Sequence, residues 1–146
     1  MNKTTYFVIL ILDKVSGYIS LEGRYNQLKV AIYCRLSDED DNKLNPDNES
    51  ESIQNQKSLL EGYVLANSWD IYDYYIDDDW SGADNDRPDW NRLLQDAEDK
   101  KFDIVLCKSQ ARFTRDMIAV EKYLHDKFLE WNIRFIGLVD NADTHN

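Results

Sequence analysis

The sequence is poor in cysteine and contains no long apolar run. Its 146 residues include two cysteines, too few for a disulfide framework. Cys34 and Cys107 both lie in apolar segments, which predicts buried thiols in a reducing compartment, and we expect a cytoplasmic protein. The apolar run at residues 6–12 is far shorter than the roughly 20 residues of a membrane span, and no small-residue cleavage site follows it. Neither a transmembrane helix nor a secretory signal is therefore expected.

Positive charge is also scarce. Seventeen Lys and Arg residues stand against 28 Asp and Glu residues, which gives a formal net charge of −11. Proteins that hold a polyanion by themselves are usually basic, so this chain is expected to grip nucleic acid poorly without a basic partner domain. The acidic residues crowd segments 38–51 and 73–86, whereas several arginines and Lys108 stand in short motifs elsewhere. This distribution leaves chemistry at a single phosphate group open.

The length and the apolar pattern predict one α/β domain. Strands are predicted at residues 29–34, 70–76, 103–107 and 133–139, and helices at residues 52–66, from Pro88 onward, and at residues 117–131. Strands that alternate with helices indicate a largely parallel sheet of four to five strands flanked by helices. Residues 1–28 do not fit this pattern, and we interpret them as an N-terminal extension, possibly a β-hairpin, outside a domain at residues 29–146.

Chemically active side chains follow two of the predicted strands. Arg35 and Ser37 come after the first strand, and the segment from Lys108 to Arg115 comes after the third. In parallel sheets, sites form beyond the carboxyl ends of the strands, so these residues are expected to share one pocket. Serine is a weak nucleophile that needs a base or strong electrostatic help. The alternative is that Ser37 is a helix N-cap before a solvated acidic loop.

Arg112 and Arg115 are three residues apart, so in a helical turn they would share a face. Planar guanidinium groups suit bidentate contact with phosphate oxygens and would neutralise charge that develops in a phosphoryl transition state. The alternative is a pair of exposed arginines that bind Asp116 or Glu121.

Further short motifs complete an ordered set. They are Glu51-Ser-Ile53 with Gln56, Ser81-Gly82, Arg87-Pro88, and Asp103 before the third strand. Together with Tyr33-Cys-Arg35-Leu-Ser37 and the segment from Lys108 to Asp116, they resemble the serine recombinases, which include resolvases, DNA invertases, and the large integrases and transposases. The resemblance runs from about residue 29 to residue 144. The long segment between Ser37 and Gln56 is most similar to the large members of the family.

The resemblance implies the catalytic domain of a site-specific DNA recombinase. Ser37 would attack a DNA phosphodiester, form a 5′-phosphoserine intermediate and release a 3′-hydroxyl, followed by strand exchange and religation without ATP, a metal or another cofactor. It implies two groups of residues around the phosphate: the catalytic Ser37, Arg35, Arg112 and Arg115, and the substrate-binding Gln56, Ser81, Arg87 and Lys108.

The resemblance also implies partners. The family's long oligomerisation helix and its DNA-binding domains are expected beyond residue 146, so this chain would be one part of a longer protein. That protein would hold DNA through its C-terminal domains and would assemble from homodimers into a tetramer on DNA, with no membrane involved.

Two rival interpretations stay open. Resolvases carry an aspartate where this chain has Ala111, so the domain is either a subfamily variant or a catalytically weakened assembly module. Alternatively, it is a non-catalytic α/β signalling or ligand-binding domain in which Asp78 or Asp79 accepts a phosphoryl group. The acidic runs at residues 38–41 and 77–79 lack a nearby histidine and are expected to be solvated rather than to bind metal ions.

Overall fold

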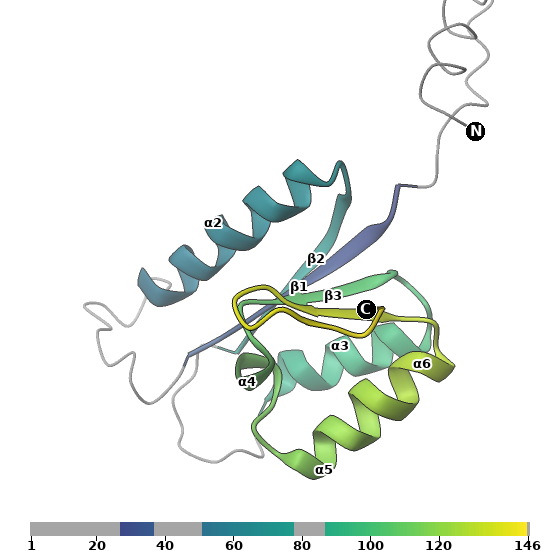
Figure 1. Cartoon of the computed structure of the whole chain (residues 1–146). Coiled ribbons are helices and arrows are strands. Elements are labelled where there is room, and N and C mark those ends of the chain that lie inside the picture. The colour runs from purple at the N-terminus through teal and green to yellow at the C-terminus, as the bar shows by residue number, and fades with distance from the viewer. Residues whose placement is uncertain (1–26, 37–50, 78–86, 146) are drawn as a thin grey trace, which may run out of the picture.

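A five-stranded sheet forms the centre of the domain. The structure is a computed structural model that describes residues 27–36, 51–77 and 87–145. The strands are β1 (Lys29–Arg35), β2 (Asp70–Asp77), β3 (Ile104–Cys107), β4 (Arg134–Gly137) and β5 (Ala142–Asp143), in the spatial order β2-β1-β3-β4-β5 (Figure 1). The β1–β2, β1–β3 and β3–β4 pairs are parallel, and only the short β5 runs antiparallel to its neighbour. The predicted α/β class with a largely parallel sheet is confirmed.

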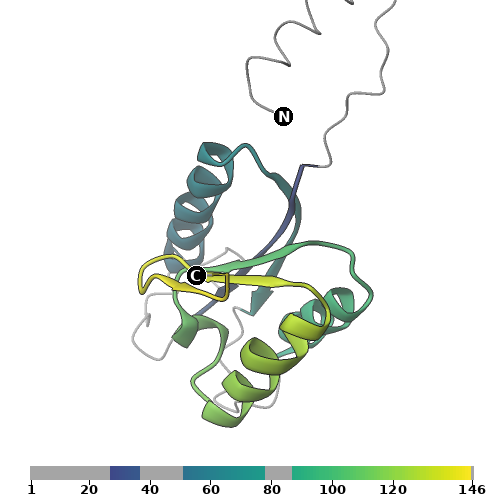
Figure 2. The same cartoon turned by 45° about the vertical axis from the view of Figure 1, so that its right-hand side comes forward.

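Helices cover both faces of this sheet. Helix α2 (Glu51–Ala66) lies on one face, and α3 (Pro88–Glu98) lies on the other beside a longer helix (Figures 1 and 2). The longer helix is continuous through α5 (Met117–Ala119), a π-helical segment η2 (Val120–Lys127) and α6 (Phe128–Glu130). One short helix, α4 (Gln110–Phe113), follows β3. Within the described residues, no helix has the length and apolar character needed to cross a membrane.

The continuous apolar run of β1 reflects burial on both sides. Val30 and Ile32 pack in the cluster under α2, whereas Ala31 and Tyr33 pack in the cluster under α3 and the longer helix. Successive side chains of a strand point to opposite faces, so a strand covered on both faces needs apolar residues throughout. Cys34 and Cys107 are buried in different clusters and are not in disulfides, as predicted. Burial raises the pKa of the Cys107 thiol well above its ordinary value.

Three helices end in the same backbone motif without glycine. Ser68, Lys100 and Asn132 follow α2, α3 and α6 with φ values of 55°, 55° and 57°. After α3, the backbone N–H of Lys100 donates to Ala97 O and that of Lys101 donates to Asp96 O, both at 3.0 Å. This pair of bonds defines a Schellman motif, which usually places glycine at the left-handed position.

The last predicted strand is too long. Residues 133–139 were expected to be extended, but β4 ends at Gly137, and the chain turns through Asn141 (φ 51°) into β5. A left-handed residue reverses the chain direction, which ends one strand and allows the next to pair antiparallel. The proposed N-terminal extension falls, apart from residues 27 and 28, outside the described residues.

The order of the strands creates a crevice. The chain moves from β1 to β2 on one side and later returns to β3 on the other side of β1. Helix α2, which follows β1, and the longer helix, which follows β3 and α4, accordingly cover opposite faces (Figure 1). The segments that follow β1 and β3 therefore diverge at the carboxyl edge of the sheet, and such switch points are where open α/β sheets bind ligands.

Candidate anion-binding site

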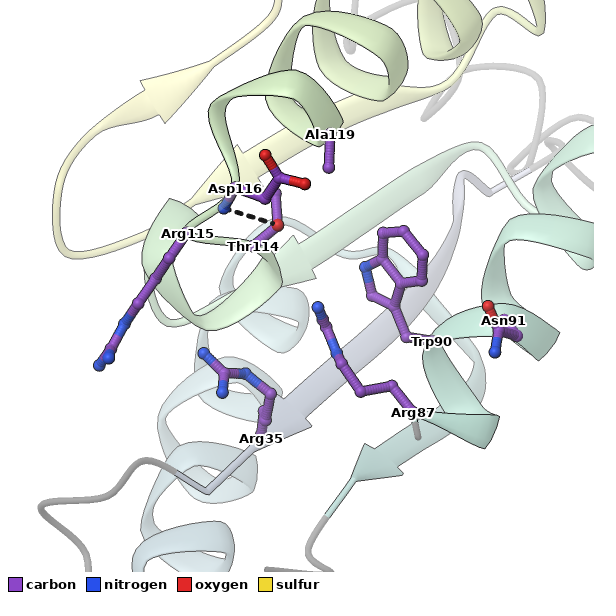
Figure 3. Close-up of a pocket in the computed structure, with 8 residues that line it drawn as sticks. All are labelled: Arg35, Arg87, Trp90, Asn91, Thr114, Arg115, Asp116 and Ala119. Atoms are coloured by element: carbon purple, nitrogen blue, oxygen red, sulfur yellow. Dashed lines mark hydrogen bonds between the residues drawn. The ribbon is translucent and has the colours of Figure 1, made fainter. Parts of the chain in front are cut away.

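A cleft of about 440 Å³ opens at this switch point. Its described lining comprises Arg35, Arg87, Trp90, Asn91, Thr114, Arg115, Asp116 and Ala119. Figure 3 shows that the three arginines reach the cleft from separate segments: the end of β1, the start of α3 and the stretch after α4. Among the described lining residues, three guanidinium groups stand against one carboxylate, which favours an anionic ligand.

Arg35 is held by the backbone of the segment that follows β3. Its Nε donates to Arg112 O at 3.1 Å and its Nη2 donates to Ala111 O at 3.0 Å. Burial, and then the positive charge of Arg87, lower the pKa of Arg35 below its ordinary value. A guanidinium in this position is stabilised by any anion that enters the cleft.

Arg87 is fixed by aromatic and backbone groups. Its Nη2 donates to the hydroxyl of Tyr33 at 2.8 Å and also to Phe113 O. Its guanidinium carbon lies 4.7 Å from the centroid of the Trp90 ring, at cation–π distance. The side chain is therefore oriented before any ligand binds.

The buried support for Arg87 was missed by the sequence analysis. The Tyr33 hydroxyl donates to Asp77 Oδ2 at 2.8 Å, and Asp77 also accepts from the backbone N–H groups of Asp89 and Trp90 at 3.0 Å each. Burial raises the pKa of Tyr33, so it stays protonated. Asp77 is 8% exposed, and its expected solvation is wrong because it caps the start of α3. A tyrosine inside an otherwise aliphatic strand was the available clue.

Gln56 faces the backbone of Arg35 rather than the open cleft. It is 1% exposed, its Oε1 accepts from Arg35 N at 3.4 Å, and its Nε2 donates to Arg35 O at 3.2 Å. A glutamine that satisfies both backbone groups of one residue fastens α2 to the end of β1. Its position in the fold is thus that of a support for Arg35.

The expectation that Arg112 and Arg115 share a helical turn is wrong. Helix α4 ends at Phe113, and Thr114 has an extended backbone (φ −158°, ψ 145°), so Arg115 lies outside the helical turn that carries Arg112. Arg115 lines the cleft. Arg112 is not among the described residues that line the cleft, and its Nη1 donates to Arg35 O at 3.4 Å. Phe113, the last residue of α4, is 0% exposed, so the helix ends on a side chain buried in the core.

The remaining predicted site residues are placed as follows. Lys108 is half-buried, its carbonyl accepts from Val139 N at 2.8 Å, and it is not among the described residues of the cleft lining. Ser37 and Ser81 lie outside the described residues. In the part of the chain that the structure describes, no group of three or more His, Cys, Asp or Glu side chains is arranged to hold a metal ion.

Comparison with known proteins places this fold and cleft in a family. Residues 30–146 match the family model of the resolvase N-terminal domain. The chain belongs to the resolvase family of serine recombinases, and it is a catalytic domain of that family, which confirms the resemblance drawn from the sequence.

Solved structures agree with this assignment. The N-terminal catalytic domain of TP901-1 integrase is 36% identical, with 81% of this chain and 83% of that chain covered and a TM-score of 0.67. A resolvase family site-specific recombinase from Streptococcus pneumoniae shares the fold at 24% identity, with 82% and 78% covered and a TM-score of 0.67. Immunity region protein 3 of Bacillus phage phi105 is 38% identical over 69 residues, which are 47% of this chain and 78% of that protein.

Proposed function

We propose that this domain cuts and rejoins DNA, with Ser37 as the nucleophile. The observation that carries the proposal is that Arg35, Arg87 and Arg115, from three separate segments, line one cleft beyond the carboxyl end of β1. Ser37 follows Arg35 by two residues in the sequence, and we propose that its hydroxyl acts on a phosphate group bound in this cleft.

The proposed step is a transesterification at phosphorus. A bond forms between Ser37 Oγ and the phosphorus atom, and the bond from phosphorus to the 3′ oxygen breaks. The hydroxyl proton passes to solvent, and the departing 3′ oxygen takes up a proton. The product is a 5′-phosphoserine that is still a phosphodiester, because one phosphoester bond has been exchanged for another, so the reverse attack by a 3′-hydroxyl rejoins DNA without ATP.

The three arginines of the cleft, together with Arg112 beside Arg35, would stabilise the charge of the pentacoordinate transition state. A guanidinium has five N–H donors, and the bonds from Arg35 to the two carbonyls of α4 engage two of its nitrogens while the rest of the group faces the cleft. Preorganised cations of this kind supply the role that a metal ion plays in many phosphoryl-transfer enzymes. Ser81 and Lys108 are proposed to help to position the substrate, and Gln56 is proposed to do so indirectly, because it holds the backbone of Arg35.

The net charge of −11 supports a division of labour in the whole protein. DNA affinity falls when few phosphates are neutralised, so we propose that basic DNA-binding domains beyond residue 146 supply the grip. Homodimers that assemble into a tetramer on DNA would bring the four required serines together.

A small activated substrate tests the chemistry without knowledge of the DNA target. In thymidine 5′-(4-nitrophenyl phosphate), 4-nitrophenolate takes the place of the 3′-oxygen leaving group. The protein should release about one equivalent of 4-nitrophenolate in the presence of EDTA and gain a thymidylyl group on Ser37, detected by intact-mass and peptide mass spectrometry.

Two matched controls show which results would contradict the proposed function. Ser37→Ala should give no burst, and thymidine 3′-(4-nitrophenyl phosphate), which presents the opposite polarity, should react far more slowly. An adduct that persists in Ser37→Ala, a requirement for a metal ion, or no burst from the unaltered protein would contradict the proposal and favour the assembly-module interpretation.

The presence of Ala111 where resolvases carry an aspartate does not by itself favour the assembly-module interpretation. Arg35 uses the backbone carbonyl of Ala111, which every residue type provides, and the Ala111 side chain is exposed. The contact between β1 and α4 is therefore independent of the side chain at position 111.

A further inference from the structure

Helix α4, which carries Arg112, is too short to hold itself in place. It spans four residues, and its backbone bonds are few: Arg112 N to Ser109 O at 3.1 Å, Phe113 N to Ser109 O at 3.4 Å and Thr114 N to Gln110 O at 2.9 Å. A single helical turn is unstable in isolation because nucleation fixes several dihedral angles for one bond. The position of Arg112 therefore depends on contacts from outside the helix.

Charged groups hold α4 at both ends. At its carboxyl end, Arg35 donates to the carbonyls of Ala111 and Arg112. At its amino end, the carboxylate of Asp140 accepts a hydrogen bond from Gln110 N at 2.9 Å. A hydrogen bond from a backbone N–H to a carboxylate is charge-assisted, and it is stronger than one between two neutral groups. Asp140 reaches this place from the turn between β4 and β5.

Gly137 makes room for this contact. A Cβ atom at position 137 would lie 2.4 Å from Asp140 Oδ1 and 3.0 Å from Gln110 N. The first separation is sterically excluded, and the second is very tight against a backbone atom, which has little freedom to move aside. The end of β4 is thus shaped so that the Asp140 carboxylate and the start of α4 can approach each other.

We propose that Asp140 is a positioning residue for DNA cleavage, because it fixes the α4 segment and thereby the place of Arg112 beside Arg35. The inference rests on the proposed function. Asp140 is exposed, so its carboxylate contributes little burial energy, and its effect on the reaction is separable from its effect on folding.

The test compares Asp140→Ala with Asp103→Ala. Asp103 is also an exposed carboxylate that accepts one backbone hydrogen bond, from Lys29 N at 2.8 Å, but it lies at the amino end of β3, away from the cleft. The readouts are the first-order rate and half-saturating concentration of the thymidine 5′-(4-nitrophenyl phosphate) burst, together with hydrogen exchange of the α4 amides.

We expect Asp140→Ala to slow the burst about tenfold at an unchanged half-saturating concentration, since small misplacements of catalytic groups cost rate more than binding. Its α4 amides should exchange faster. Asp140→Asn, which keeps an acceptor oxygen, should recover most of the rate, and Asp103→Ala should react like the unaltered protein.

The outcomes separate the two proposals. No burst from the unaltered protein contradicts the proposed function, and the positioning claim is then judged on exchange alone: unchanged protection of the α4 amides in Asp140→Ala overturns it. Where the unaltered protein reacts, an equal burst rate in Asp140→Ala overturns the inference and leaves Asp140 as a purely structural cap.

Discussion

Replacing Tyr33 with phenylalanine removes the buried hydroxyl that joins Asp77 to Arg87. The ring stays, so its packing against Phe113, at 6.1 Å between centroids, is preserved. Three hydrogen bonds are lost: one to the Asp77 carboxylate at 2.8 Å, and two from the Arg87 guanidinium at 2.8 and 3.2 Å. The substitution therefore tests whether orientation of Arg87 matters to the reaction.

The expected magnitude follows from the partners that remain. A hydrogen bond to a charged group contributes about 1.5–3 kcal/mol. Asp77 keeps the backbone N–H groups of Asp89 and Trp90, and Arg87 keeps Phe113 O, so neither charge is left alone. We expect the free energy of unfolding to fall by about 2 kcal/mol, and Tm to fall by roughly 8 °C at about 4 °C per kcal/mol.

The assay pairs thermal unfolding with the burst of 4-nitrophenolate, and Tyr75→Phe is the control. Tyr75 is equally buried, and its hydroxyl donates to the Asp96 carboxylate at 2.7 Å away from the cleft. Both variants should lose similar stability, but only Tyr33→Phe should slow the burst, by about tenfold. Equal burst rates in the two variants at a temperature where both are folded would refute the positioning of Arg87 by Tyr33.

Four further outcomes are expected. Lys100→Gly should raise the free energy of unfolding by about 0.5–1 kcal/mol in urea titrations, because glycine adopts the left-handed backbone (φ 55°) without a Cβ clash, and a loss of stability would contradict the assigned motif. Burial raises the pKa of Asp96, but the hydrogen bond from Lys101 lowers it, and the resulting pKa lies below its ordinary value. The stabilisation is therefore present above the ordinary aspartate pKa of about 3.9 and is lost as the pH falls through the lowered value. In Asp96→Asn, the urea concentration at the midpoint of unfolding should depend less on pH between pH 7 and pH 3. Arg112→Ala should slow the burst about a hundredfold, as loss of transition-state electrostatics costs roughly 3 kcal/mol, and Ala111→Asp should raise the rate only if the alanine is a lesion.

The elements of this fold were readable from local patterns. The apolar run of β1 and the spacing of Val120, Leu124 and Phe128 in the long helix are properties of the chain itself, and each formed the predicted element. Helix ends were harder to predict, because Ser68 and Lys100 occupy left-handed positions where glycine is the usual marker. Their left-handed backbone is held by the hydrogen bonds that close each helix, from Trp69 N to Val64 O and from Lys101 N to Asp96 O.

The candidate site, like the fold, was predictable from the sequence only in part. The sequence by itself determined that Arg35 and the Lys108–Arg115 segment would meet at one edge of the sheet, since parallel strands put their carboxyl ends together. Only the tertiary structure decided the orientation of the side chains. It turned Gln56 onto the Arg35 backbone, buried Asp77 and separated Arg115 from Arg112, because burial and hydrogen-bond satisfaction depend on neighbours distant in the sequence.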